Sequence, residues 1–265
     1  MMRSGMGSFF GQDAGMSNLV HADRRGHVLV LSIQREAKRN AVNQDIADGI
    51  DAGLRTLDDD HDLWVGVLTG TTAVFSAGSD LSGLGATTPD GGEYGMIRRD
   101  RRKPLIAAVE GIALGGGLEI VLACDLVVAA RNAQFGLPEV RRGLVPTCGA
   151  LFRTPRAMPL NLARELILTG DPIGAERAYA AGFVNVLCEP GDAVDAAVAL
   201  AERLCENAPL SVQACLGAVN ALVGADDGDG WDATAAALDS LLGTHDMTEG
   251  VQAFFEKRSP EWTGR

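Results

Sequence analysis

The sequence predicts an α/β fold that is followed by an all-helical C-terminal region. Up to about residue 192, short runs of Val, Leu and Ile alternate with segments of helical spacing, and this alternation is typical of α/β proteins. After that residue, apolar side chains recur only at helical spacing. A chain of 265 residues is long enough for one large domain with a smaller appendage.

Each element follows from the local pattern of apolar residues. Strands are predicted where a short apolar run is bounded by polar residues or glycine, at Val28–Ile33, Trp64–Thr69, Leu105–Val109, Leu126–Ala130 and Phe183–Val186. Helices are predicted where apolar residues recur every three or four positions, at Asn43–Leu57, Leu118–Cys124, Asn161–Leu168, Glu176–Ala181, Ala193–Cys205, Leu210–Leu222, Trp231–Leu242 and Met247–Lys257.

The segments between the predicted strands and helices also have compositions that indicate their structure. Ser76–Asp80 predicts a turn that opens a helix, and the Gly-, Thr- and Pro-rich segment Gly83–Gly95 predicts a mobile surface loop. The acidic segment Gly224–Gly230 predicts a linker or turn. We therefore expect a flexible N-terminal extension at residues 1–17, an α/β core at 18–205, and a helical region at 206–265 that packs on another subunit.

Composition excludes several classes of protein. Hydrophobic residues make up 46% and charged residues 22%, which is ordinary for a globular protein. A net charge of −12 argues against nucleic-acid and anionic-membrane partners, because both require Lys and Arg. The five cysteines are scattered without a CxxC pair, which argues against a disulfide scaffold or a metal site and favours a reducing, cytoplasmic location.

Familiar catalytic motifs are absent from the sequence. There is no P-loop, no HExxH, no GxSxG, and no third spaced glycine after Gly115-Gly116-Gly117 that would complete a dinucleotide fingerprint. The four histidines all lie outside the motif-rich middle of the chain, so a histidine-based triad is not indicated.

Three glycine-rich or proline-containing segments carry the positive signal. In Leu114–Glu119, three glycines after a strand let a ligand approach backbone N–H groups at a helix N-terminus, where negative charge is favoured. Phe75–Leu81 also exposes N–H groups, and Pro138 places Glu139 in a first helical turn. Taken singly, the glycines are ordinary turns, and Asp80, Glu119 and Glu139 are ordinary helix-capping carboxylates.

Taken together, these segments resemble the crotonase, or enoyl-CoA hydratase/isomerase, superfamily. The resemblance runs from Lys103 through Asp125, includes Phe75–Leu81, Pro138-Glu139 and Gly143–Pro146, and extends over roughly residues 20 to 260. It implies a crotonase-type spiral of β-β-α units with a C-terminal helical region, assembled as a homotrimer or homohexamer.

The resemblance also implies a reaction, the reversible addition of water to a 2-enoyl-CoA thioester. It assigns the oxyanion hole to the backbone N–H groups of Ser79 and Gly116, water activation to Glu119, and proton supply to Glu139. No metal or redox cofactor is implied, since coenzyme A is part of the substrate. CoA-binding and substrate-binding positions are implied at Lys38, Arg39, Ala41, Ala77, Gly78, Asp80, Leu81, Gly115, Thr147, Phe254 and Lys257.

Three positions depart from the family pattern, and they keep other reactions open. Ser82 stands where many hydratases have a phosphate-contacting lysine, Thr147 replaces a glycine that commonly helps to hold water, and Glu110 replaces the usual Asn or Asp. Thr147 favours a relative such as a carnitinyl-CoA-type dehydratase. The remaining alternatives are a Δ3-Δ2-enoyl-CoA isomerase, which uses one carboxylate, and a non-catalytic CoA- or RNA-binding relative.

Overall fold

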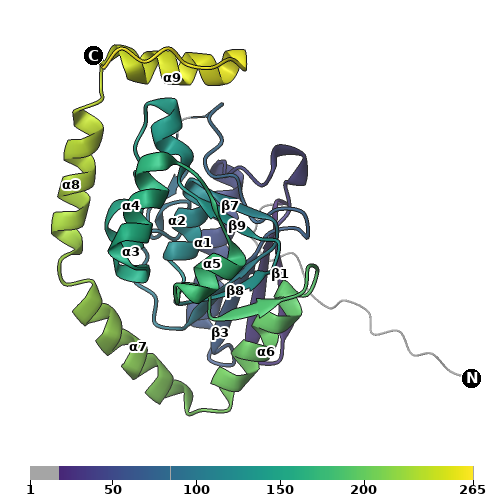
Figure 1. Ribbon diagram of the computed structural model, residues 1–265. Helices are drawn as coiled ribbons and strands as arrows, with labels where there is room; N and C mark the ends of the chain where they lie inside the picture. Colours follow the sequence, from purple (N-terminus) through teal and green to yellow (C-terminus); the bar gives the residue numbers. More distant parts are fainter. Residues whose placement is uncertain (1–17, 84, 265) are drawn as a thin grey trace, which may run out of the picture.

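A six-stranded sheet forms the centre of the molecule (Figure 1), in a computed structural model that describes residues 18–83 and 85–264. Its strands lie in the order β1 (Val20–Arg25), β2 (Val28–Ile33), β3 (Val65–Thr69), β6 (Leu105–Val109), β8 (Leu126–Ala130) and β11 (Val186–Cys188). β1 and β2 pair antiparallel, and every other pair in this sheet is parallel. Every residue of β3 and β6 is buried, as expected for parallel strands covered on both faces.

A second, smaller sheet gives the fold its spiral repeat. After β6 the chain forms β7 (Ile112–Leu114) and then α2 (Gly116–Leu122); after β8 it forms β9 (Gln134–Gly136), which pairs parallel with β7. β10 (Ile173–Gly174) completes the small sheet. Single bridges from Ser76 to Ala113 and from Val42 to Ser79 continue this layer toward earlier units. The expected spiral of β-β-α units is therefore confirmed.

Helices cover both faces of the large sheet. The remaining elements are η1 (Glu36–Lys38), α1 (Gln44–Asp59), β4 (Thr87–Thr88), β5 (Gly92–Glu93), η2 (Pro138–Arg142), α3 (Ala150–Ala157), α4 (Leu160–Thr169), α5 (Ala175–Ala180), α6 (Ala193–Cys205), α7 (Pro209–Val223), α8 (Asp227–Asp239) and α9 (His245–Glu256). α1 and α2 pack on one face in the main core, and α6 packs its small residues on the other.

The departure at Glu110 has a structural reason. Its side chain is 3% exposed, and Oε1 accepts hydrogen bonds from Gly191 N at 2.8 Å and from Ala193 N at 3.0 Å. Ala193 is the first residue of α6, so Glu110, directly after β6, holds the N-terminus of the helix that covers the second face.

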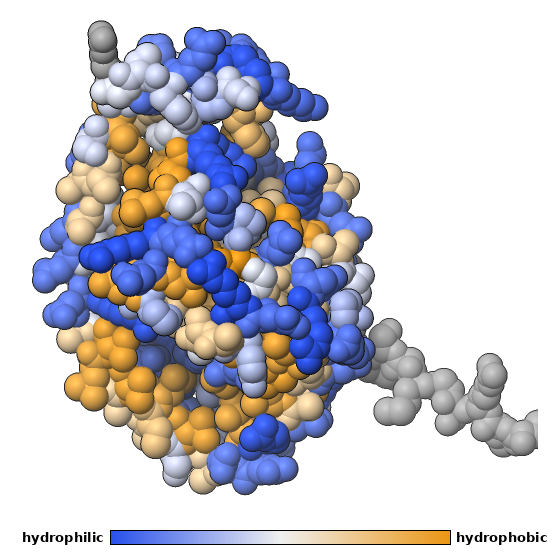
Figure 2. All heavy atoms as spheres, in the orientation of Figure 1, coloured by the Kyte–Doolittle hydropathy of each residue, from blue (hydrophilic) through white to orange (hydrophobic). Residues whose placement is uncertain are grey.

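The C-terminal helices run around the outside of the core (Figure 1). No residue of α7 is buried in this single chain, although the helix is rich in apolar residues. Leu210 is 77% exposed and Leu222 is 80% exposed, and Val219 and Val223 are also exposed. Figure 2 shows apolar side chains gathered at the lower left, where α7 lies. This surface is unusual for an isolated domain.

Most predicted elements are confirmed, with four corrections. Ser76–Asp80 opens no helix but joins the strand layer and then a series of turns. Gly83–Gly95 is a surface loop only in part, because it contains β4 and β5 and buries Ala86, Thr88 and Tyr94. The strand predicted at 183–186 lies instead at Val186–Cys188, and residues 227–230 belong to α8 instead of a linker. The elements that were not predicted are β1, η1, β4, β5, β7, β9, α3 and β10. The expected extension at residues 1–17 lies outside the described residues.

Candidate active site

Two glycine-containing turns meet at the start of α2. Leu114 N donates to Ser76 O at 3.0 Å, and a Cβ added at Gly78 would lie only 2.8 Å from Gly116 N. Gly116 is the first residue of α2, so its N–H has no acceptor within the helix. The N–H of Ser79 likewise has no acceptor in the part of the chain that the structure describes. Ser79 and Gly116 thus present two N–H groups from adjacent turns.

Glu119 lies behind these donors, in the first turn of α2. Its side chain is 2% exposed, and Oε1 accepts hydrogen bonds from Cys148 N at 2.7 Å and from Ala150 N at 3.1 Å. Burial raises the pKa of Glu119, while the two N–H donors oppose that rise. The donors fix one oxygen of the carboxyl group and leave the other available for chemistry.

Glu139 faces the same point from η2. A Cβ added at Gly115 would lie 3.1 Å from Glu139 Oε1, so the carboxyl group lies directly against the turn that opens α2. Glu139 Oε2 is buried and has no hydrogen-bond partner among the described residues. Burial first, and then the negative charge of Glu119, raise the pKa of Glu139 to about 7. One carboxylate is thus held by N–H donors, and the other readily keeps a proton.

Tyr94 and Cys148 complete the site, and neither was predicted from the sequence. The Tyr94 hydroxyl lies 2.6 Å from Ser79 Oγ, and its ring is 4% exposed. A Cβ at Gly116 would lie 2.3 Å from the same hydroxyl oxygen, so the phenol packs directly on that glycine. The one available signal was a lone tyrosine in a segment otherwise rich in glycine and threonine.

The predicted CoA-binding positions near the N-terminus do come together. Ala77 N donates to Arg39 O at 2.9 Å, and Val42 N donates to Gly78 O at 2.8 Å. These bonds join the two turns that contain Lys38, Arg39, Ala41, Ala77, Gly78, Asp80 and Leu81. The side chains of Lys38 and Arg39 are exposed beside these turns.

Asp80 has a structural partner, although not the one expected. Its carboxylate pairs with Arg35 at 2.7 Å and accepts from Ser82 N and Ser82 Oγ. The hydrogen bond from the Ser82 hydroxyl, followed by that from Arg35, lowers the pKa of Asp80 to about 2. The expectation that Asp80 caps a helix is wrong, because no helix starts there. The Arg35–Asp80 ion pair instead links the turn at 77–81 to the segment before η1.

The other predicted binding residues lie elsewhere around the site. Thr147 is exposed, with Oγ1 3.8 Å from Cys148 Sγ. The ring of Phe254, on α9, packs 4.4 Å from the Arg142 guanidinium of η2. Lys257 ends α9 and is exposed. Among the described residues, no hydrogen bond, ion pair or ring contact joins Phe254 or Lys257 to the turns at 38–41 and 77–81.

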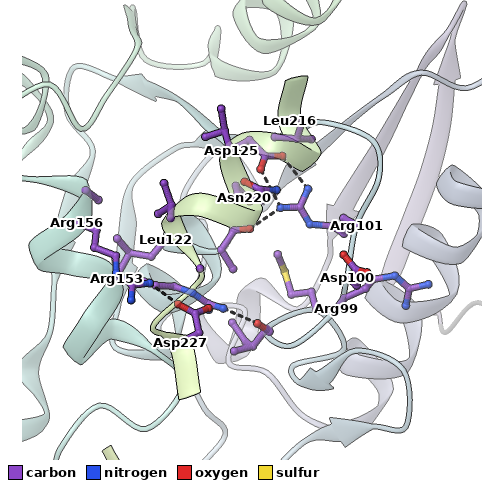
Figure 3. Close-up of a pocket in the computed structure, with 18 residues that line it drawn as sticks. Arg99, Asp100, Arg101, Leu122, Asp125, Arg153, Arg156, Leu216, Asn220 and Asp227 are labelled. Atoms are coloured by element: carbon purple, nitrogen blue, oxygen red, sulfur yellow. Dashed lines mark hydrogen bonds and ion pairs between the residues drawn. The ribbon is translucent and has the colours of Figure 1, made fainter. Parts of the chain in front are cut away.

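A separate cavity of about 420 Å³ lies between the core and the helices α7 and α8 (Figure 3). Its wall carries the Arg101–Asp125 ion pair, at 2.8 Å, and the Arg156–Asp227 ion pair. None of Ser79, Gly116, Glu119 and Glu139 lines it. The cavity therefore reflects loose packing of the C-terminal helices on the core, and not the site of the two carboxylates.

No group of three or more His, Cys, Asp or Glu residues in ranges 18–83 and 85–264 has the arrangement of a metal site. Within the same ranges, no helix has the length and apolar character needed to cross a membrane.

Known proteins share this architecture over almost the whole chain. A family model described as enoyl-CoA hydratase/isomerase matches residues 23–265. A carnitinyl-CoA dehydratase of Salmonella paratyphi A is 36% identical over 262 residues, covering 94% of this chain and 100% of that protein. A solved carnitinyl-CoA dehydratase from Mycobacterium avium 104 has a TM-score of 0.88 and 43% identity, covering 93% of this chain and 99% of the other. A solved enoyl-CoA hydratase from Mycobacterium tuberculosis H37Rv has a TM-score of 0.76 and 43% identity, with the same coverage.

Proposed function

The chain belongs to the enoyl-CoA hydratase/isomerase family, and on that premise we propose that it catalyses the reversible addition of water to a 2-enoyl-CoA thioester. One observation carries the proposal: the carboxyl groups of Glu119 and Glu139 lie at the turn that opens α2, and among the described residues only that of Glu119 is held by backbone N–H donors of other residues. Hydration needs one base and one acid at adjacent carbons, and this pair provides both.

The proposed oxyanion hole consists of the N–H groups of Ser79 and Gly116. Attack on a 2-enoyl thioester places negative charge on the thioester oxygen, and two fixed donors stabilise that charge without rearranging. Gly78 and Gly116 support this role because their lack of Cβ atoms allows the two turns to approach so closely.

We propose that Glu119 accepts a proton from water and that Glu139 donates one to Cα. The free oxygen of Glu119 removes a proton from water as the water oxygen bonds to Cβ, and the π electrons move onto the thioester oxygen. Protonated Glu139 then delivers its proton to Cα as the carbonyl reforms. A proton returns from Glu119 to Glu139 before the next cycle. Acid–base chemistry of this kind needs no metal or redox cofactor, and dehydration runs through the same steps in reverse.

CoA is proposed to lie along the joined turns at 38–41 and 77–81. The exposed cationic side chains of Lys38 and Arg39 suit the phosphates of CoA, and the glycine and alanine residues let the ligand approach the backbone closely. Arg35 is committed to Asp80 and therefore contributes through the shape of the turn. Phe254 and Lys257 remain proposed CoA contacts, with a neighbouring subunit as the partner.

We also propose that the chain assembles as a homotrimer or homohexamer, because α7 has an exposed apolar surface. α7 exposes a row of large apolar residues, and the cavity beneath it shows that it packs loosely on its own core. Burying such a row in a subunit interface would remove its contact with water. Residues 206–265 are thus proposed as the assembly region. The free cysteines fit the proposed cytoplasmic location.

A carnitinyl-CoA-type dehydratase is the second candidate. It is favoured by the full-length similarity to two proteins of that name and by Thr147 beside the site. A panel of 2-enoyl-CoA, 3-hydroxyacyl-CoA and carnitinyl-CoA substrates, with products identified by mass spectrometry, separates the candidates. Gain or loss of one water on the first two classes supports the hydratase, whereas turnover of carnitinyl-CoA alone supports the second candidate. Migration of a double bond without a change in mass would contradict both.

A further inference from the structure

Tyr94 touches both turns of the proposed oxyanion hole. Its hydroxyl lies 2.6 Å from Ser79 Oγ, within hydrogen-bond distance. A Cβ added at Gly116 would lie 2.3 Å from the same hydroxyl oxygen, so this oxygen also packs against the backbone of Gly116. Tyr94 is buried whereas Ser79 is exposed. The hydroxyl therefore holds Ser79 from the inner side and leaves its outer side open to a ligand.

The backbone holds the segment at Ser79 from the side of Val42. Both neighbours of Ser79 are bonded to Val42, whose N–H donates to the preceding carbonyl at 2.8 Å and whose carbonyl accepts from the following N–H at 2.9 Å. Among the described residues, no hydrogen bond joins Ser79 directly to Gly116. The contact between the Ser79 and Tyr94 hydroxyls is therefore a second attachment of this segment, and it lies next to the other turn.

Tyr94 has a backbone conformation that is rare for an aromatic residue. Its φ is 56°, in the left-handed region, and such a conformation persists only where surrounding contacts enforce it. Two contacts do so here: Tyr94 N donates to Ala86 O at 2.8 Å, and Gly95 packs so tightly that a Cβ would lie 2.1 Å from Ala47 O. Residues held in this way are concentrated at functional sites, which singles out Tyr94 for a role beyond packing.

Asp51 of α1 fixes the chain on both sides of Tyr94. Its buried carboxylate accepts a hydrogen bond from Thr88 Oγ1 at 3.1 Å and forms an ion pair with Arg99 at 2.7 Å. Thr88 precedes Tyr94 and Arg99 follows it, so one side chain ties both flanks of the segment to the same helix. The Tyr94 hydroxyl therefore has a fixed position in the core from which it can orient Ser79.

We propose that Tyr94 is a positioning residue whose hydroxyl orients the turn at Ser79 relative to Gly116, so that both N–H groups reach one thioester oxygen. The inference rests on the proposed function and deepens it. An oxyanion hole is effective because its donors are fixed before the reaction begins. Burial raises the pKa of Tyr94 well above its usual value, so the hydroxyl stays protonated and no proton transfer is assigned to it.

Infrared spectroscopy of a bound, unreactive thioester tests the proposal without turnover. The probe is butanoyl-CoA with a heavy carbon isotope at the thioester carbonyl, and it has no double bond to hydrate. Hydrogen bonds to the carbonyl oxygen lower its stretching frequency, so the ligand bound to the wild type should absorb at a lower frequency than the free ligand. Tyr94→Phe should lose about half of that shift, because one of the two donors is misplaced. Tyr179→Phe, at an exposed position on α5, is the matched control and should keep all of it.

Hydration of 2-butenoyl-CoA gives a second measurement. Tyr94→Phe should lower kcat and kcat/KM by the same factor, about fivefold, as expected for the loss of one hydrogen bond that acts in the transition state. Ser79→Ala keeps the backbone N–H and removes the other hydroxyl of the same bond, so both its infrared shift and its kcat should fall by as much. The double variant should be no slower than the slower single variant, because both substitutions remove one bond.

A full infrared shift in either folded variant, no shift in the wild type, or kcat losses that multiply in the double variant would overturn the proposal. If Tyr94→Phe does not fold, as judged by circular dichroism, Ser79→Ala alone must lose part of the shift for the proposal to stand. A wild type that does not hydrate 2-butenoyl-CoA, but whose infrared shift is reduced by Tyr94→Phe, would contradict the hydratase reaction and support the positioning role of Tyr94.

Discussion

The carboxylate oxygen Oε1 of Glu119 accepts a hydrogen bond from the backbone N–H of Cys148 at 2.7 Å. This bond, with that from Ala150, favours the charged form of Glu119, whereas Glu139 Oε2 has no such donor among the described residues. Burial raises the pKa of both glutamates, but backbone N–H donors of other residues oppose that rise at Glu119 alone.

The rate of hydration should fall as the pH rises through the pKa of Glu139. Its pKa is raised to about 7, so the proton that must reach Cα is lost above neutral pH. A profile of kcat/KM against pH should show a descending limb near pH 7. Removing the negative charge of Glu119, by Glu119→Gln, should move any residual limb to lower pH. A flat profile between pH 6 and 9 would contradict the assignment of Glu139 as the acid.

Glu139→Gln should stabilise the protein at alkaline pH. A folded pKa near 7, against 4.5 for the free side chain, means that the native state holds its proton more tightly than the unfolded state. That contribution to stability is complete below about pH 4.5 and is lost as the pH rises through 7. The variant has no such loss, so its gain over the wild type should grow to about 3 kcal/mol at pH 8.

Denaturant unfolding at pH 5 and pH 8 measures this difference in the free energy of unfolding. A gain of equal size at both pH values would show that Glu139 does not titrate between them, which is contrary to its burial beside Glu119.

Gly116→Pro removes the backbone N–H and should lower kcat by about a hundredfold or more, the usual loss for one oxyanion-hole donor, whereas Gly116→Ala keeps the N–H and should lower kcat by displacing it. The added Cβ would lie 2.3 Å from the Tyr94 hydroxyl oxygen, so either the ring or the turn must move. Tyr94→Ala in the same chain removes the collision, and the double variant should be no slower than Gly116→Ala alone. Near-normal turnover of Gly116→Pro, with an intact fold, would show that the thioester oxygen is not held at this turn.

About half of the site could be predicted from the sequence. Glu119, Glu139, Gly116 and Ser79 follow glycine or proline signals that act locally on the backbone, and the structure brings them together. Tyr94 could not be predicted, because its place is set by its own contact with Gly116 and by that of Gly95 with Ala47, and both partners are distant in sequence. Composition around it indicated only a loop.

The fold also contains elements that the local sequence predicts and elements that depend on distant contacts. Longer elements with a clear period, such as Val28–Ile33 and Ala193–Cys205, match the prediction residue for residue. Strands of three residues, such as β7 and β9, are too short for a period, and they exist because they pair with each other. The role of Glu110 could not be predicted either, because its hydrogen-bond partners at the start of α6 follow more than 80 positions later in the sequence.

The assembly should be a trimer or hexamer in solution, because α7 leaves a row of apolar residues uncovered. Multi-angle light scattering at micromolar concentration gives the mass directly. Replacing Val219 and Leu222 with Lys should dissociate the assembly if α7 lies in the interface, since buried unpaired charges are costly. A monomeric wild type would contradict the proposal, and with it the cross-subunit role of Phe254 and Lys257.

The central claim is that two carboxyl groups act as one acid–base unit, and single-turnover hydration of 2-butenoyl-CoA tests it most directly. Glu110→Gln is the matched control, since Glu110 is equally buried and also accepts two backbone N–H bonds, but holds α6. Glu119→Gln and Glu139→Gln should each lower the rate by about a hundredfold or more, and the double variant should be little worse than the slower single, because residues that act together are not additive. Glu110→Gln should keep the wild-type rate. Loss of activity in only one of the two site variants would instead indicate a one-carboxylate isomerase and would contradict the account.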